Sequence, residues 1–158
     1  MKIKGITDED FVNYKYPSMF IATSICSFKC EKECGIKGMC QNHPLATAPG
    51  IELPDERIVK RFLSNDISKA VVFGGLEPFD QFEELLELIS KFRAQTSADI
   101  VIFTGYTELE LSDKIQPLSQ FKNIIIKFGR YIPNQKPHYD EVLGIELASN
   151  NQYAKRIS

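Results

Sequence analysis

The residues best suited to chemistry are four cysteines that lie close together in the first third of the chain. Cys26, Cys30, Cys34 and Cys40 follow the pattern C-x3-C-x3-C-x5-C, and the chain has no other cysteine to pair with them. Clustered thiolates bind zinc or iron–sulfur clusters. Structural zinc sites usually take two pairs of ligands separated by a longer excursion, which this stretch lacks. The spacing therefore favours an iron–sulfur cluster, with a zinc site as the main alternative and reactive or buried thiols as the remainder.

The composition predicts one ordinary globular domain, residues 1–158, with 43% hydrophobic and 25% charged residues around a single core. A formal net charge of −2 gives no electrostatic case for nucleic-acid binding. No apolar run approaches the ~18 residues that a membrane span needs. Because the N-terminal sequence MKIKGITDEDF lacks the apolar region of a signal peptide, we expect a cytoplasmic protein, where disulfides are rare.

Apolar, β-rich runs alternate with helical patterns along the chain. The predicted strands are residues 18–24, 70–73, 100–103 and 123–128, with a short terminal strand within 143–157. The predicted helices run from Pro54 to about Leu63, over residues 79–92, and over residues 108–115, where Pro117 closes the last one. Continuous apolar strands separated by helices predict a parallel sheet with covered faces.

Unusual sequences follow the predicted strands at their carboxyl ends. The cysteine stretch follows the first strand, Gly74 and Gly75 follow the second, and Thr104-Gly105-Tyr106 follows the third. Because the carboxyl ends of parallel strands meet at one edge of a sheet, we expect these segments to form one site.

The order of these motifs resembles the radical S-adenosylmethionine enzymes, and most of all the small activating proteins of the anaerobic (class III) ribonucleotide reductase. The segments that carry the resemblance are IATSICSFKC, CQNHP, AVVFGGLEPF, IVIFTGY and LASNNQ, between about Met19 and Gln152. In that family a strand leads into a C-x3-C-x2-C loop, and Gly-Gly-Glu-Pro, Thr-Gly-Tyr and Ser-x-Asn-Gln elements follow. The resemblance implies a partial (truncated) TIM-barrel-like parallel sheet with flanking helices, since four or five predicted strands are too few to close a barrel.

The resemblance also implies roles for matching residues. Cys26 and Cys30 match the first two ligands of a [4Fe-4S] cluster. Gly74, Gly75, Glu77 and Pro78 match the element whose backbone receives the amino group of S-adenosylmethionine, although Leu76 splits this element and shifts its amides.

Two further elements match the family outside the cluster loop. Thr104, Gly105 and Tyr106 match a loop beside the mouth of the active site. Ser149, Asn151 and Gln152 match the C-terminal element, for which we predict no particular role.

The third cluster ligand is where the chain departs from the family. Cys40 is followed by Gln-Asn-His-Pro, which matches the family sequence and favours Cys40 as the third ligand. A cluster held by Cys40 implies that the loop contains an insertion, which carries Cys34. Cys34 would instead make the loop one residue too long. If all four cysteines ligate, no iron is open to S-adenosylmethionine.

The function implied is that of a [4Fe-4S] activating enzyme that cleaves S-adenosylmethionine reductively. The resulting 5′-deoxyadenosyl radical would install a glycyl radical on a partner such as anaerobic ribonucleotide reductase, with electrons from a protein such as flavodoxin. The alternatives are a closed iron–sulfur protein for electron transfer or structure, and a zinc-stabilised interaction module. We interpret His43 as a turn residue, and Lys122, Lys127 and Arg130 as a mildly basic solvated edge.

Overall fold

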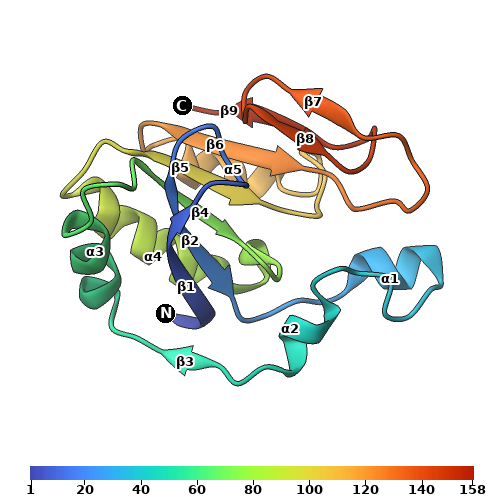
Figure 1. The fold of residues 1–158 in the computed structure, drawn as a ribbon, viewed down its shortest axis with the longest axis horizontal. Helices are drawn as coiled ribbons and strands as arrows, with labels where there is room; N and C mark the ends of the chain where they lie inside the picture. The colour runs from blue at the N-terminus through green and yellow to red at the C-terminus, as the bar shows by residue number, and fades with distance from the viewer.

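The computed structural model describes residues 1–158 and has a seven-stranded sheet in the order β3-β1-β2-β4-β5-β6-β9 (Figure 1). The strands of this sheet are β1 (Lys2–Asp10), β2 (Ser18–Thr23), β3 (Ile51–Glu52), β4 (Ala70–Gly74), β5 (Asp99–Phe103), β6 (Ile124–Phe128) and β9 (Tyr153–Arg156). A separate hairpin contains β7 (His138–Asp140) and β8 (Ile145–Leu147). Strands β2, β4, β5 and β6 are parallel neighbours in chain order, so their carboxyl ends form one edge.

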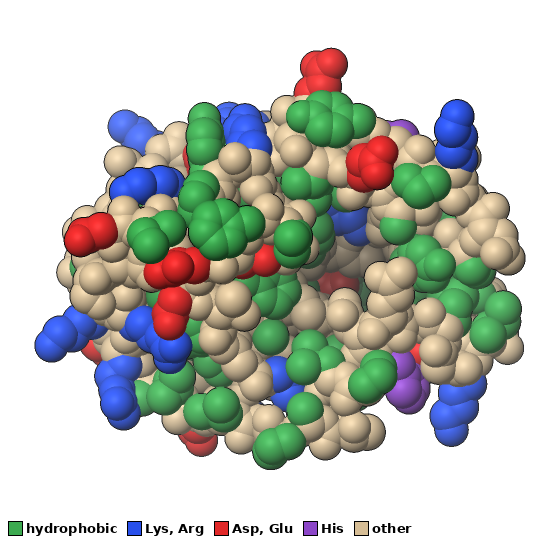
Figure 2. Space-filling view, viewed as in Figure 1, with side chains coloured by type: hydrophobic (Ala, Val, Ile, Leu, Met, Phe, Trp, Pro, Cys, Tyr) green, Lys and Arg blue, Asp and Glu red, His purple; other side chains and the backbone are tan.

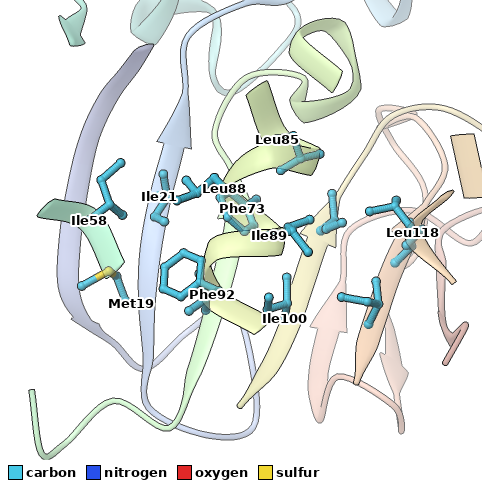
Figure 3. Packing of buried hydrophobic residues seen from close by; sticks show 14 of the residues in the cluster. Met19, Ile21, Ile58, Phe73, Leu85, Leu88, Ile89, Phe92, Ile100 and Leu118 are labelled. Atoms are coloured by element: carbon cyan, nitrogen blue, oxygen red, sulfur yellow. The ribbon is translucent and has the colours of Figure 1, made fainter. Parts of the chain in front are cut away.

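Helices connect the parallel strands and cover one face of the sheet. They are α3 (Asp55–Leu63), the 3-10 helix η1 (Pro78–Gln81) with α4 (Phe82–Arg93), and α5 (Ser112–Leu118). Phe73 of β4 points into the core beneath these helices, where Phe92 and Ile58 pack (Figure 3). Val71 of the same strand belongs to this cluster. Burial of such large apolar side chains is the main stabilising contribution to the domain.

The opposite face of the sheet carries no helix. Ala70 and Val72 alternate with the core residues of β4 and pack instead with Leu143 and Leu147 of the hairpin region. Two short helices, α1 (Lys29–Cys34) and α2 (His43–Thr47), follow β2 and lie beside the sheet rather than on the helical face (Figure 1). The helix-free face is therefore left open next to the cysteine stretch.

The structure confirms the α/β class, the four apolar strands and the helices over 54–63 and 79–92. The four predicted strands are parallel, but the sheet is mixed, because β1, β3 and β9 pair antiparallel with their neighbours. Strand β1 was hidden by its charged residues, which it tolerates because on its outer side only Lys2 and Ile3 pair with another strand, the two-residue β3. None of the helices combines the length and apolar character of a membrane span.

The helix predicted over 108–115 is also displaced. It begins at Ser112 and passes through Pro117 to Leu118. Residues 108–111 form turns instead, and the backbone amide and hydroxyl of Thr107, just before them, donate to Glu110. Pro117 lacks only the N–H that would bond Asp113, and the helix ends at the next residue, Leu118.

Candidate functional site

A cavity of about 660 Å³ opens on the helix-free face at the carboxyl ends of the parallel strands. Its walls come from the cysteine stretch, from Gly74 and Gly75, and from Thr104 and Gly105, so the three expected segments do come together. Figure 2 shows this face hollowed near its middle, with charged side chains inside the hollow. The volume lies within the range of about 300–1,000 Å³ that is typical of small-molecule and cofactor sites.

The four cysteines are not equivalent in this structure. Cys26, Cys30 and Cys40 line the cavity, and the thiols of Cys30 and Cys40 lie within hydrogen-bonding reach of each other. Cys34 ends α1 with its side chain exposed and does not line the cavity. No three His, Cys, Asp or Glu side chains converge on one point that could hold a single metal ion. A [4Fe-4S] cube does not need such convergence, because each cysteine binds a different iron.

Burial keeps the thiols of Cys26 and Cys30 protonated in the absence of metal. It raises the pKa of Cys26 to about 12, against a hydrogen bond from the backbone of Phe28. It also raises the pKa of Cys30 to about 11, and the neighbouring Cys40 adds to this effect. Because a metal binds thiolates, loading the site has to release these protons.

Asp80 joins the start of the cysteine stretch to the sheet. Its Oδ2 accepts from the backbone N–H of Ser27 at 2.6 Å, and its Oδ1 accepts from the hydroxyl of Tyr106 at 2.5 Å. The amide of Glu77 donates to the carbonyl of Ile25 at 2.8 Å. The residues before α1 are therefore fixed to the ends of both β4 and β5.

Gly75 requires glycine for two independent reasons. Its φ of +81° is a conformation that side chains disfavour. A Cβ there would lie 2.9 Å from Leu45 Cδ2 and 3.2 Å from Ala22 Cβ. The turn absorbs the extra residue Leu76, whose side chain is buried. The glycine pair thus brings bare backbone to the cavity wall.

Glu77 links the ends of two parallel strands from a buried position. Its carboxylate accepts from Thr104 Oγ1 at 2.7 Å, from the amide of Gly105 at 2.9 Å and from the amide of Phe79 at 3.2 Å. Burial raises the pKa of Glu77 to about 7 in spite of these hydrogen bonds. Pro78 follows as the first residue of η1 and is buried.

Lys127 lies inside the cavity, so its placement on a solvated basic edge is wrong. Every residue of β6 is buried, and the Lys127 ammonium donates to the carbonyl of Gly129 at 2.9 Å. Burial lowers the pKa of Lys127 to about 8, while the charge of Glu77 acts in the opposite direction. A single charged residue within the apolar run IIIKF was the available sequence signal. Such a residue needs a polar environment or a ligand.

The C-terminal element supports the segment that follows β6. Asn151 Nδ2 donates to the carbonyl of Arg130 at 2.9 Å, and Gln152 Nε2 donates to that of Gly129 at 3.3 Å. The hydroxyl of Ser149 accepts from the amide of Ile132 at 2.8 Å. These three residues therefore hold the backbone beside Lys127 in place.

Tyr106 lies between two cations at the side of the cavity. Lys29 Nζ is 4.4 Å from its ring centroid and Arg130 Cζ is 5.7 Å from it. Burial and the hydrogen bond to Asp80 raise the pKa of Tyr106 to about 12, so the ring stays neutral.

A smaller adjoining cavity is lined by Tyr106, Lys29 and Arg130 together with Cys26 and Cys30. His43 lines neither cavity and begins α2.

Comparison with known proteins identifies the family. A family model described as a 4Fe-4S single cluster domain matches residues 18–153, which is most of the chain. No curated protein and no solved structure gives a significant match. The matched segment contains the cysteine stretch, the glycine pair and the C-terminal element. The chain therefore belongs to the 4Fe-4S single cluster domain family, which is associated with radical S-adenosylmethionine enzymes, and is an iron–sulfur protein.

Proposed function

We propose that this protein is a radical S-adenosylmethionine enzyme that activates a partner enzyme. In this proposal Cys26, Cys30 and Cys40 hold a [4Fe-4S] cluster, and S-adenosylmethionine binds in the same cavity. The observation that carries the proposal is that these three cysteines line one cavity with Gly74 and Gly75, while Cys34 lies outside it. Three ligands leave one iron open, as a catalytic site requires by analogy with open zinc sites.

The residues present fit both groups. Thiolates are the ligands of iron–sulfur clusters, and three cysteines line this cavity. The Lys127 ammonium has a single hydrogen bond within the chain, to Gly129, so further donors remain for an anionic group such as the carboxylate of S-adenosylmethionine. The backbone at Gly75 can approach a ligand without a side chain in between.

When bound, the cluster supplies the electron that cleaves S-adenosylmethionine to methionine and a 5′-deoxyadenosyl radical. The protein orients the bound S-adenosylmethionine and shields it from water. Lys127 and the glycine pair fix the methionine end of the ligand, and Leu45 and Phe20 contribute apolar walls that exclude water. Glu77 and Thr104 keep the two strand ends at a constant separation. No acid or base is needed in this scheme.

The proposed substrate is a glycine in a loop of a partner enzyme such as anaerobic ribonucleotide reductase, with flavodoxin or a similar protein as reductant. The cavity mouth supports this because Val12, exposed on the loop between β1 and β2, lies at its rim. Sequential parallel strands with helices on one face support the proposal of a partial β/α barrel. That architecture leaves one side open to a protein substrate.

The test is anaerobic reconstitution with iron and sulfide, followed by reduction in the presence of S-adenosylmethionine. The expected result is a brown protein that forms 5′-deoxyadenosine, with cluster content lost in Cys26→Ala, Cys30→Ala and Cys40→Ala but kept in Cys34→Ala. A brown protein that forms no 5′-deoxyadenosine, with equal cluster loss in Cys34→Ala and Cys40→Ala, would indicate a closed cluster. A colourless protein that unfolds with chelator would indicate zinc.

A further inference from the structure

The insertion between Cys30 and Cys40 is closed by a buried carboxylate. Glu31 is only 8% exposed, although it lies in the short surface helix α1. Its Oε1 accepts from the amide of Cys40 at 3.2 Å and lies 2.8 Å from His43 Nδ1. One carboxylate therefore ties the residue after Cys30 to the far end of the insertion.

The contact between Glu31 and Cys40 places Cys40, and not Cys34, next to Cys30. Helix α1 carries the chain away from Cys30, so that Cys34 ends exposed at the helix terminus. The chain then returns, and the bond from Cys40 to Glu31 places the Cys40 thiol beside that of Cys30. Neither cysteine spacing nor strand geometry makes this choice between the two thiols.

The same histidine also contacts the beginning of the loop. The rings of His43 and Phe28 lie 5.2 Å apart at 51°. Phe28 has φ 52° and ψ 39°, a left-handed conformation that is rare for an aromatic residue and that neighbouring contacts must maintain. In this conformation the Phe28 amide donates to Cys26 Sγ at 3.3 Å. Hydrogen bonds to cluster sulfurs help to set the reduction potential.

We infer that Glu31 and His43 form a positioning pair for the cluster. Glu31 places Cys40 as the third ligand, and His43 supports the Phe28 conformation that aims an N–H at Cys26 Sγ. Neither residue is a ligand or a catalytic residue. The inference rests on the proposed function, and it explains how a loop with an insertion can still present three cysteines.

The role of Glu31 is tested on the reconstituted protein by the rate of cluster loss to a chelator. Glu31→Ala should lose its cluster about tenfold faster or more, the scale seen for outer partners of metal ligands. Glu31→Gln keeps an oxygen acceptor for the Cys40 amide and should recover most of the retention. Glu33→Ala is the matched control, because Glu33 lies in the same helix but its carboxylate faces Arg130. It should lose the cluster at the wild-type rate.

The role of His43 is tested with two variants, each of which removes one of its two contacts, either the ring beside Phe28 or the nitrogen beside Glu31. His43→Asn keeps a nitrogen donor near the position of Nδ1 but removes the ring beside Phe28. It should retain the cluster and show a more negative reduction potential, because the reduced state loses an N–H bond to Cys26. His43→Phe keeps the ring but not the donor. It should hold the wild-type potential and lose the cluster faster.

The outcomes distinguish failure of this pair from failure of the proposed function. If the wild-type protein holds no cluster or forms no 5′-deoxyadenosine, the proposed function fails. If the wild type does both, but Glu31→Ala retains its cluster like Glu33→Ala and both His43 variants keep the wild-type potential, the positioning role is wrong. Should Glu31→Ala fail to fold by circular dichroism, the half-exposed His43 variants decide alone.

Discussion

Arg130 and Glu110 form a two-pronged ion pair beside the cysteine stretch. Arg130 Nη1 donates to Glu110 Oε2 at 2.8 Å, and Nη2 donates to Oε1 at 2.6 Å. The same guanidinium faces Glu33 of α1, with Nε 3.1 Å from its Oε2. Arg130 therefore connects α1 to the loop after β5, and the pairing should hold α1 against the sheet.

Substitution of Glu110 should weaken this connection in a pH-dependent way. Arg130 lowers the pKa of Glu110 to about 2, so the stabilisation is complete above the ordinary value of 4.5 and is lost as pH falls through about 2. Because the pair is partly exposed, Glu110→Gln should lower the free energy of unfolding by only about 0.5–1 kcal/mol at neutral pH. Urea unfolding of the metal-free chain measures this difference, which should disappear near the lower pKa.

Hydrogen exchange gives the local readout for the same variant. Amides of α1 should exchange faster in Glu110→Gln, whereas Glu108→Gln should leave them unchanged. Glu108 has a comparable exposed ion pair, but its partner is Lys155 of β9. Equal exchange of α1 in both variants would contradict a connection through Arg130.

Gly75→Ala should destabilise the domain by about 1–3 kcal/mol, the cost of a side chain in a left-handed conformation. The added Cβ would also press on Leu45 Cδ2 at 2.9 Å. Gly105→Ala is the matched control, because its nearest contact would be an ordinary 3.6 Å. Thermal unfolding should therefore show a clear decrease for Gly75→Ala and little change for Gly105→Ala. Equal changes would contradict the strain argument.

Thiol alkylation should distinguish the four cysteines of the metal-free, reduced chain. Cys34 is exposed, whereas burial raises the pKa of Cys26 and Cys30 and keeps them as weakly nucleophilic thiols. A limiting amount of iodoacetamide at neutral pH should label Cys34 first, as peptide mass spectrometry would show. Preferential labelling of Cys26 or Cys30 would contradict the placement of Cys34 outside the cavity. The denatured chain, in which all four should react similarly, is the control.

Much of the fold could be predicted because β4, β5 and β6 are continuous apolar runs bounded by turns. Their order along the chain also predicted that the cysteines and Gly74 would meet at one edge. Strand β1 could not be predicted, because KIKGITDED is largely polar and acquires its structure by pairing with β2. Sequence patterns describe local runs well and edge pairing poorly.

The sequence motifs predicted which segments form the site, but not which side chains line its cavity. Lys127 belongs to a strand that was predicted, yet which of its residues face the cavity depends on register against β5 and β9. The choice between Cys34 and Cys40 depends on the contact of Glu31 with Cys40 and His43, which spans the insertion. Such contacts are tertiary, and the spacing of cysteines contains no information about them.

Lys127→Met should change how stability depends on pH in the metal-free chain. Burial lowers the pKa of Lys127 from 10.5 to about 8, so between these values the unfolded chain binds the proton more strongly than the folded one. The free energy of unfolding should therefore rise with pH over this interval, by about 3 kcal/mol from this group at ~1.4 kcal/mol per pH unit. Lys127→Met should lack this rise, while Lys122→Met, which removes an exposed lysine, should keep it. Parallel curves for the wild type and Lys127→Met in urea titrations would show that Lys127 is solvated rather than enclosed in the cavity. The same variant in the reconstituted protein should bind S-adenosylmethionine more weakly than Lys122→Met does, because the cavity loses the ammonium that we assign to the carboxylate.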